Sequence, residues 1–257
     1  MGGRAAASKN HHFELTFSIM KVVAMSDLHG YLPKVDRIPE CDVICICGDI
    51  VPLEYQNNMA SSVAWFCLEF IPWTDKLNCK KVVFIAGNHD FFLYNLAYTA
   101  EGMAKPKDVL KKLLPGNNYG KHKVIYLQDS SVEIEGKLFY GTPWVGGLPG
   151  WAFNGVEEEL DEIWEKIPYN LDALLTHQPS NFNNEGRVLQ YAPYPNFGSD
   201  ILARKLNDKH VRYTFCGHVH SGDHKEYEYK PGCEVVNVSV KDENYMPKYI
   251  TFKVYET

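Results

Sequence analysis

The feature that most constrains the fold is a set of short apolar runs that recur along the chain with little alternation between apolar and polar residues. Runs of this kind are typical of β-strands buried on both faces, as in a sheet that helices cover. The five runs are Lys21–Met25, Asp42–Cys47, Lys81–Ala86, Leu171–Leu175 and Val211–Cys216. Each run ends abruptly in polar residues, so the pattern predicts an α/β protein with polar loops after its strands.

Other segments show the periodicity of helices and of antiparallel strands. One-sided apolar stripes predict helices at residues 58–70, 108–114, 157–167 and 199–206. Alternating, turn-bounded segments predict antiparallel β-structure at residues 123–128, 131–135, 137–140, 225–229, 234–240 and 248–255. Strand, helix and strand units mixed with hairpins indicate two sheets packed between helices.

The length of 257 residues suits one large α/β domain, expected over residues 20–257. Residues 1–19 precede the first apolar run and are expected to be an N-terminal extension, a cloning remnant or an extra edge strand. They lack a basic region followed by a continuous apolar stretch, so they do not predict a signal peptide. No run approaches the roughly 18 apolar residues that span a bilayer. We therefore expect no membrane partner.

Charge and cysteine content narrow the function classes further. The formal net charge of −6 at pH 7 argues against a protein that holds long nucleic acid by bulk electrostatics. The seven cysteines form no Cys-x-x-Cys pair, and several lie in apolar runs, which indicates buried free thiols in a reducing compartment. We expect a cytoplasmic protein that is a monomer or a homodimer.

Polar residues follow the carboxyl end of each of the five runs. In parallel α/β sheets, sites collect beyond these ends, so the polar stretches are expected to converge. Their carboxylate, amide and imidazole groups are suitable ligands for divalent metal ions. Gly48, Gly87 and Gly217 precede ligand candidates, and we expect them to let the backbone turn sharply. The stretches read SDLHG, GDIV, GNHD, THQPS and GHVH.

In this order, the stretches SDLHG, GDIV, GNHD, LLTHQPS and GHVH resemble the calcineurin-like metallophosphoesterase superfamily. The segments VIYLQDSSVEIEGKLFYGTPW and GWAFN add a likeness to its small branch that includes the animal metallophosphoesterase-domain-containing proteins and is similar to class III cyclic-nucleotide phosphodiesterases. The resemblance covers about residues 20–257. It implies a four-layer α/β/β/α sandwich of two mixed β-sheets flanked by helices.

The resemblance also implies a centre of two divalent metal ions, with Mn²⁺ preferred and Fe, Zn, Ni or Mg as alternatives. Animal members carry glycine at the second histidine of GHxH, whereas this chain keeps His220, so both metal positions are expected to be complete. The first ion would be held by Asp27, His29, Asp49 and His220. The second would be held by Asp49, Asn88, His177 and His218, with Asp49 as the bridge.

His89 is the candidate general acid, because it directly follows a ligand and is not itself required by a metal. Asp90 is expected to orient and stabilise His89, the alternative being a turn carboxylate that accepts backbone N–H groups. The expected reaction is in-line attack of a metal-bridging hydroxide on a small phosphodiester such as a nucleotide. The alternatives are a phosphomonoesterase or nuclease of the same superfamily, or a metal-binding scaffold without activity.

Three further residues are candidates for substrate binding. Trp144 and Trp151 are candidates for a base-binding wall, since nucleobases stack on aromatic rings, with anchoring of a loop as the alternative. Arg187 is a candidate contact for a substrate phosphate, with plain solvent exposure as its alternative. The long polar segment at residues 179–197 directly follows His177 and is predicted to cap the site.

Overall fold

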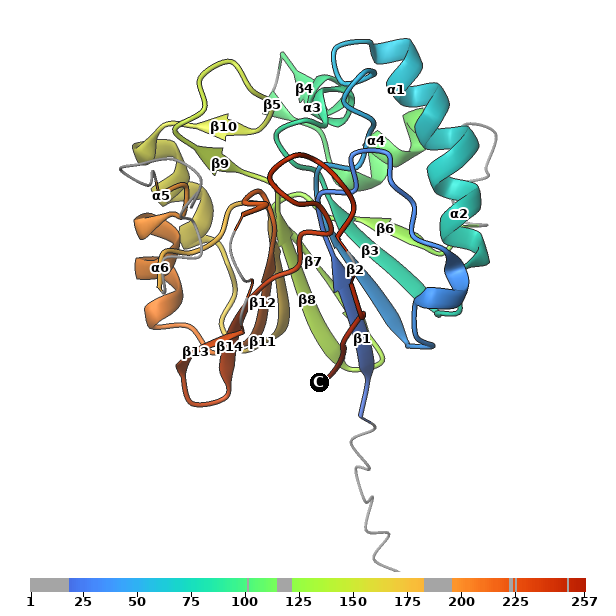
Figure 1. Ribbon diagram of the computed structural model, residues 1–257. Helices are drawn as coiled ribbons and strands as arrows, with labels where there is room; N and C mark the ends of the chain where they lie inside the picture. Colours follow the sequence, from blue (N-terminus) through green and yellow to red (C-terminus); the bar gives the residue numbers. More distant parts are fainter. Residues whose placement is uncertain are drawn as a thin grey trace, which may run out of the picture.

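Two large mixed sheets pack face to face, and helices cover the outer face of each sheet (Figure 1). This arrangement confirms the predicted four-layer α/β/β/α sandwich. None of the described helices is long and apolar enough to cross a membrane. The computed structural model describes residues 19–100, 102–114, 122–182, 196–221, 224, 226–248 and 250–257.

The first sheet has the strand order β15-β1-β2-β3-β6. Its strands are β1 (Lys21–Met25), β2 (Val43–Cys47), β3 (Lys81–Ile85), β6 (Val124–Tyr126) and β15 (Val254–Glu256). All run parallel except β15, which is antiparallel to β1. The expectation of antiparallel structure at residues 123–128 is therefore wrong. Two helices lie between β3 and β6, and such crossover connections join parallel strands.

The second sheet has the strand order β13-β14-β12-β11-β8-β7. Its central strands β8, β11, β12 and β14 are parallel, and β7 and β13 are antiparallel edges. The predicted hairpin is confirmed as β7 and β8, with Val132 paired to Phe139. The strands are β7 (Ser130–Ile134), β8 (Lys137–Thr142), β11 (Leu171–Thr176), β12 (Val211–Cys216), β13 (Tyr227–Lys230) and β14 (Cys233–Asn237).

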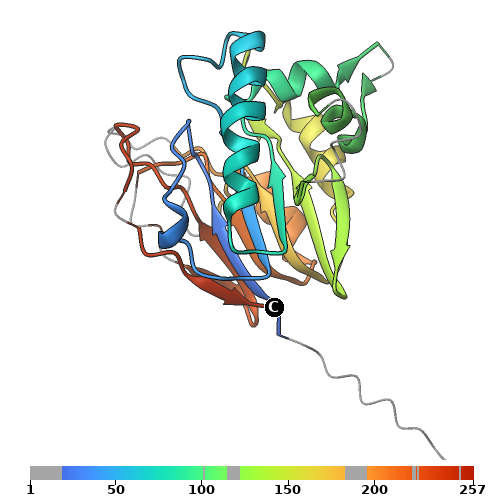
Figure 2. The same cartoon turned by 90° about the vertical axis from the view of Figure 1, so that its right-hand side faces the viewer.

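The predicted helix at residues 58–70 continues further than expected, because α1 (Met59–Trp65), a π-helical turn (Phe66–Phe70) and α2 (Ile71–Lys76) follow one another directly. Figure 2 shows this continuous helical segment along the first sheet. Pro72 stands in the first turn of α2. Because proline has no N–H group, it cannot donate a backbone hydrogen bond within the helix, and the wider π-helical turn directly before it accommodates this loss.

Three of the four remaining helices match predicted segments. Ser199 caps the last of them by accepting a hydrogen bond from the Leu202 N–H at 3.1 Å. Helices α3 and α4 lie over the first sheet and α5 and α6 over the second. The bounds are α3 (Phe91–Ala97), which the sequence did not predict, α4 (Pro106–Leu113), α5 (Glu157–Glu165) and α6 (Asp200–Asn207). The remaining elements are short. They are a 3-10 turn at Val35–Arg37 and two pairs of strands, β4 (Tyr98–Thr99) with β5 (Gly102–Met103) and β9 (Val145–Gly146) with β10 (Asn154–Gly155).

The apolar runs are continuous because each strand faces two cores. In β1, Val23 and Met25 pack towards the helices, whereas Val22 and Ala24 pack between the two sheets. A third core lies under α5 and α6 and contains the fully buried Trp164. All seven cysteines lie within the described ranges and are free thiols, as expected from their spacing.

Candidate active site

The loops after five strands meet at the carboxyl edges of both sheets. The two sheets are joined there, since Ser26 after β1 forms a bridge with Ser239 after β14, and the Ser26 N–H donates to the Val238 carbonyl at 2.9 Å. The Asp27 N–H donates to the Gly48 carbonyl at 3.0 Å. The seven candidate ligands converge at this edge, all buried except the half-buried His218.

Several of these residues have a backbone conformation that L-amino acids rarely adopt. The φ angles are 56° at Asp27, 40° at His29, 54° at Asp49 and 69° at His218. Each such residue costs about 1–3 kcal/mol and persists only where the surrounding structure enforces it, commonly at functional sites. Four of the ten described non-glycine residues with positive φ are therefore candidate ligands.

The glycines before the ligands serve two different purposes. Gly48 has a φ of 95° and makes the sharp turn that the sequence predicts. At Gly87 and Gly217, however, the requirement is space for the carboxylates. A Cβ atom on Gly87 would lie 2.2 Å from Asp49 Oδ1, and one on Gly217 would lie 2.3 Å from Asp27 Oδ2.

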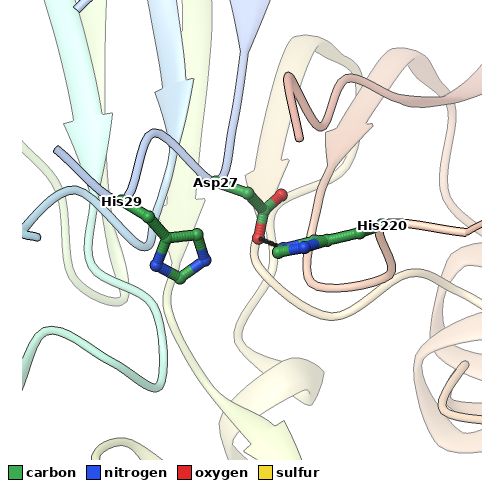
Figure 3. Close-up of side chains that lie close together, drawn as sticks. All are labelled: Asp27, His29 and His220. Carbon is green, nitrogen blue, oxygen red and sulfur yellow. Dashed lines mark ion pairs between the residues drawn. The ribbon is translucent and has the colours of Figure 1, made fainter. Parts of the chain in front are cut away.

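A first group of donors consists of Asp27, His29 and His220, whose ligand atoms lie within 4.8 Å of one another (Figure 3). His220 Nε2 lies 3.1 Å from Asp27 Oδ1, and His29 Nε2 lies 3.6 Å from Asp49 Oδ2. Both ring nitrogens of His29 are buried, and within the described part of the chain neither has a hydrogen-bond partner.

Buried polar atoms without a partner are costly, so His29 indicates that a ligand belongs beside it. Burial lowers the pKa of His29 to about 4. The ring is therefore neutral at pH 7, which is the form that binds metal ions. With the carboxylate of Asp27 and the imidazole of His220, this donor set fits a divalent cation.

A second group of donors surrounds the amide oxygen of Asn88. His177 Nε2 and His218 Nδ1 each lie 2.9 Å from Asn88 Oδ1. His177 Nε2 also lies 3.3 Å from Asp49 Oδ2. The other nitrogen of His177, Nδ1, donates to the Cys47 carbonyl at 2.8 Å. This bond leaves Nε2 directed at Asn88 and Asp49, as is usual for a metal-ligating histidine.

Asp49 belongs to both groups, because one of its carboxylate oxygens, Oδ2, lies 3.6 Å from His29 Nε2 and 3.3 Å from His177 Nε2. Burial would raise the pKa of Asp49, but the charges of His177 and His89 outweigh burial and lower it well below its usual range. Burial likewise opposes ionisation of Asp27, and the charge and hydrogen bond of His220 lower its pKa. Two buried anions among imidazoles suit a pair of divalent ions.

His89 lies at the edge of this centre. Its backbone N–H donates to Asp49 Oδ1 at 2.8 Å, and its Nε2 lies 3.8 Å from Asp49 Oδ2. Its other ring nitrogen, Nδ1, is hydrogen-bonded to Gln56 Oε1. Gln56 therefore stands where the sequence analysis expected Asp90.

Asp90 has the role that was weighed as the alternative. Its carboxylate accepts hydrogen bonds from the backbone N–H groups of Gly87 at 2.9 Å, Ile50 at 3.0 Å and Val51 at 3.3 Å. The expectation that Asp90 orients His89 directly is therefore wrong. Asp90 begins helix α3, and its side chain points back to the loop after β2 instead.

Two aromatic rings lie against the histidines of the centre. The Trp151 ring centroid lies 4.6 Å from that of His89, in agreement with its expected place at the site. The Tyr245 ring lies 4.8 Å from His220 and 5.0 Å from His29. Tyr245 was not predicted, because no motif surrounds it, and only its contacts and its φ of 60° single it out.

Trp144 has a structural role and does not form the predicted wall of the site. Its indole N–H donates to Asp129 Oδ2 at 2.7 Å, and its ring packs on Phe153. It therefore anchors a loop, which was the alternative expected for it.

Arg187 and most of the predicted cap, residues 183–195, lie outside the described residues. The end of the cap does approach the site, since the Phe197 ring lies 6.1 Å from that of His218.

The fold and the site define a class of protein: an α/β/β/α sandwich whose strand ends build a buried centre of histidines and carboxylates suited to divalent metal ions. The chain belongs to the calcineurin-like phosphoesterase family, whose model matches residues 20–222. The family model is that of a metallophosphoesterase, and the donor groups of the site suit divalent metal ions.

Known proteins support the same assignment. The chain is 32% identical over 174 residues to human metallophosphoesterase domain-containing protein 1. The matched region covers 62% of the chain and 48% of the relative. It is 26% identical over 220 residues to a UPF0046 protein of Caenorhabditis elegans, which covers 79% of the chain and 52% of the relative. The chain thus spans about half the length of these relatives.

Among solved structures, one similar fold is that of a phosphopantetheinyl hydrolase from Mycobacterium tuberculosis. The TM-score is 0.51 at 15% sequence identity, and the match covers 91% of this chain and 95% of that chain. At this identity the likeness concerns the fold alone.

Proposed function

We propose that the protein is a phosphodiesterase that uses two divalent metal ions, Mn²⁺ by preference, to hydrolyse small phosphodiesters, nucleotides among them. The observation that carries the proposal is the pair of donor groups that share Asp49, one of which contains His29, whose ring nitrogens have no hydrogen-bond partner among the described residues. When bound, two such ions would neutralise phosphate charge and acidify a water molecule. Their ligands would be Asp27, His29, Asp49 and His220 for one ion and Asp49, Asn88, His177 and His218 for the other.

In this proposal, His89 is the general acid that protonates the leaving oxygen. Its Nε2 atom is on the side of the ring near Asp49, at 3.8 Å from Oδ2, whereas Nδ1 is occupied by Gln56. The ligand atoms of His89, His29 and Asp49 lie within 4.8 Å of one another, but neither proposed ligand set needs His89, so it is available as a proton donor.

The substrate is proposed to be small and to present a flat or apolar group beside His89. Trp151 supports this, because its ring lies against His89 and remains 36% exposed. Tyr245 would close the opposite side, over His29 and His220. The net charge of −6 gives no reason to expect a long nucleic acid. The preference for diesters rests on the likeness to the small branch of the family.

Two wider expectations belong to the same proposal. We propose that residues 20–257 form one catalytic domain, because the family match begins at residue 20 and the last strand, β15, pairs with β1. A cytoplasmic location would suit the seven free cysteines, since such thiols persist in reducing compartments.

The proposal is tested by turnover of metal-stripped protein restored with Mn²⁺. The substrates are bis-p-nitrophenyl phosphate, p-nitrophenyl phosphate and the 2′,3′- and 3′,5′-cyclic nucleotides, with His89→Ala as the control variant. Diester cleavage that requires both Mn²⁺ and His89 supports the proposal. Faster cleavage of the monoester would identify a phosphomonoesterase instead, and no turnover by protein with two bound ions would refute an esterase function on these substrates.

A further inference from the structure

His89 has a side-chain partner that no sequence motif indicates. Its Nδ1 atom is hydrogen-bonded to the amide oxygen Oε1 of Gln56, which lies 33 residues earlier in the chain. With Oε1 facing the ring, the proton of this pair is assigned to Nδ1, because an amide oxygen only accepts hydrogen bonds. The other ring nitrogen, Nε2, is left on the side of Asp49. Gln56 therefore fixes both the rotation of the ring and the nitrogen that faces the centre.

The turn that carries Gln56 is anchored at its C-terminal side. It lies at residues 53–57, directly before α1. The Tyr55 N–H donates to the Pro52 carbonyl at 2.9 Å, and the Tyr55 carbonyl accepts the Ser62 hydroxyl at 2.7 Å. Gln56 itself is half-buried. A side chain on such a turn is pre-positioned, so it can hold its partner without ordering itself first.

The same turn is held at its N-terminal side by Asp90. The carboxylate accepts the backbone N–H groups of Ile50 and Val51, which begin the loop that leads to Gln56. Asp90 thus holds the loop that carries Gln56 and makes no hydrogen bond of its own to the His89 ring.

We propose that Gln56 is the positioning residue of the general acid, holding His89 so that Nε2 faces the leaving oxygen of the substrate. This inference rests on the proposed function, because it assumes that His89 donates a proton. In the step itself, water adds to phosphorus and one of its protons passes to solvent. The bond from phosphorus to the leaving oxygen breaks, Nε2 gives its proton to that oxygen, and Nδ1–H stays bonded to Gln56.

The test uses two methyl aryl diesters whose leaving oxygens differ in basicity and therefore in their need for a general acid. Methyl p-nitrophenyl phosphate releases a stable anion that leaves without a proton, whereas methyl phenyl phosphate releases a more basic oxygen. Gln56→Met keeps the length of the side chain but removes the acceptor, and Gln56→Glu restores an acceptor. Asn57→Leu is the matched control, because Asn57 is an exposed amide in the same turn.

For Gln56→Met, we expect kcat/KM for methyl phenyl phosphate to fall about 10–100-fold, the usual effect of losing a partner that orients a site histidine. The value for methyl p-nitrophenyl phosphate should fall much less. Gln56→Glu and Asn57→Leu should both stay near wild type with both diesters. An equal loss on the two diesters, or no loss on either, would overturn the proposal, because a purely structural role does not distinguish leaving groups.

A second readout does not depend on turnover. In ¹⁵N spectra of the metal-free protein, with the His89 signals assigned by their loss in His89→Ala, the neutral ring should carry its proton on Nδ1. Gln56→Met should abolish this preference, and an unchanged tautomer would overturn the inference. If His89→Ala keeps full activity on methyl phenyl phosphate, the proposed function fails instead, while the spectra still report on the Gln56 bond.

Discussion

Replacing Gly217 by alanine should disrupt the proposed metal centre although no candidate ligand is replaced. The new Cβ would lie 2.0 Å from Ser26 Oγ and 2.3 Å from Asp27 Oδ2. Contacts of Cβ atoms shorter than 3.0 Å are essentially never tolerated, so Asp27 or the strand end must move by several tenths of an ångström. The Asp27 carboxylate cannot move freely, because it accepts the His218 N–H at 3.0 Å and pairs with His220 at 3.1 Å.

Overpacking of this kind costs about 1–3 kcal/mol, which corresponds to a fall in Tm of about 2–12 °C for a chain of this size. The effect on the site should be larger, because misplacing catalytic groups by about 1 Å can cost 10²-fold in rate. Mn²⁺ affinity should fall together with activity.

Calorimetric Mn²⁺ titration and thermal unfolding of the metal-free variant separate the two effects. Gly198→Ala is the control, since its Cβ would meet neighbouring atoms only at 3.1 Å or beyond, in the side chains of Asn196 and Asn181 and the backbone of Asn181. Gly217→Ala with wild-type Mn²⁺ affinity and wild-type turnover would refute the argument that this glycine exists to make room for Asp27.

The remaining predictions concern the bridge, the substrate wall and pH. Asp49→Asn should lose both metal ions together, because Asp49 faces both donor groups, and mass spectrometry that still finds two ions per chain would contradict the bridge. Trp151→Ala should raise KM for nucleotide diesters several-fold, since stacking is worth about 1–3 kcal/mol, and an unchanged KM would remove Trp151 from the substrate site. In the metal-free protein, burial lowers the pKa of His29 to about 4 and that of His218 to about 3. Both rings bind protons more readily when unfolded, so the free energy of unfolding should fall as pH drops from about 6.5 towards 4, and urea denaturation that shows no such fall would contradict these shifts.

Much of the fold was predictable because the apolar runs reflect strands that face two cores. The direction of the strands, parallel or antiparallel, was harder to predict. Strand β6 (Val124–Tyr126) has the same local pattern as a hairpin strand, and only its pairing with β3 makes it parallel. Helix α3 (Phe91–Ala97) was missed because its seven residues follow the site motif directly and show no clear amphipathic stripe.

The candidate ligands were found from sequence because each stands immediately after a strand. What the motifs did not reveal are contacts between distant segments. The pairing of Gln56 with His89, the room that Gly87 leaves for Asp49, and the Tyr245 ring over His29 all depend on loops far apart in the chain. Asp90 was misassigned for the same reason, since its neighbour in sequence is not its partner in space.

The measurement that tests the central claim most directly is electron paramagnetic resonance of the metal-stripped protein during titration with Mn²⁺. A shared Asp49 carboxylate would hold two ions about 3.5–4 Å apart. The account predicts that two Mn²⁺ bind per chain and give the multiline signal of an exchange-coupled pair. Binding of a single ion, or of two ions with independent six-line signals, would contradict a centre bridged by Asp49.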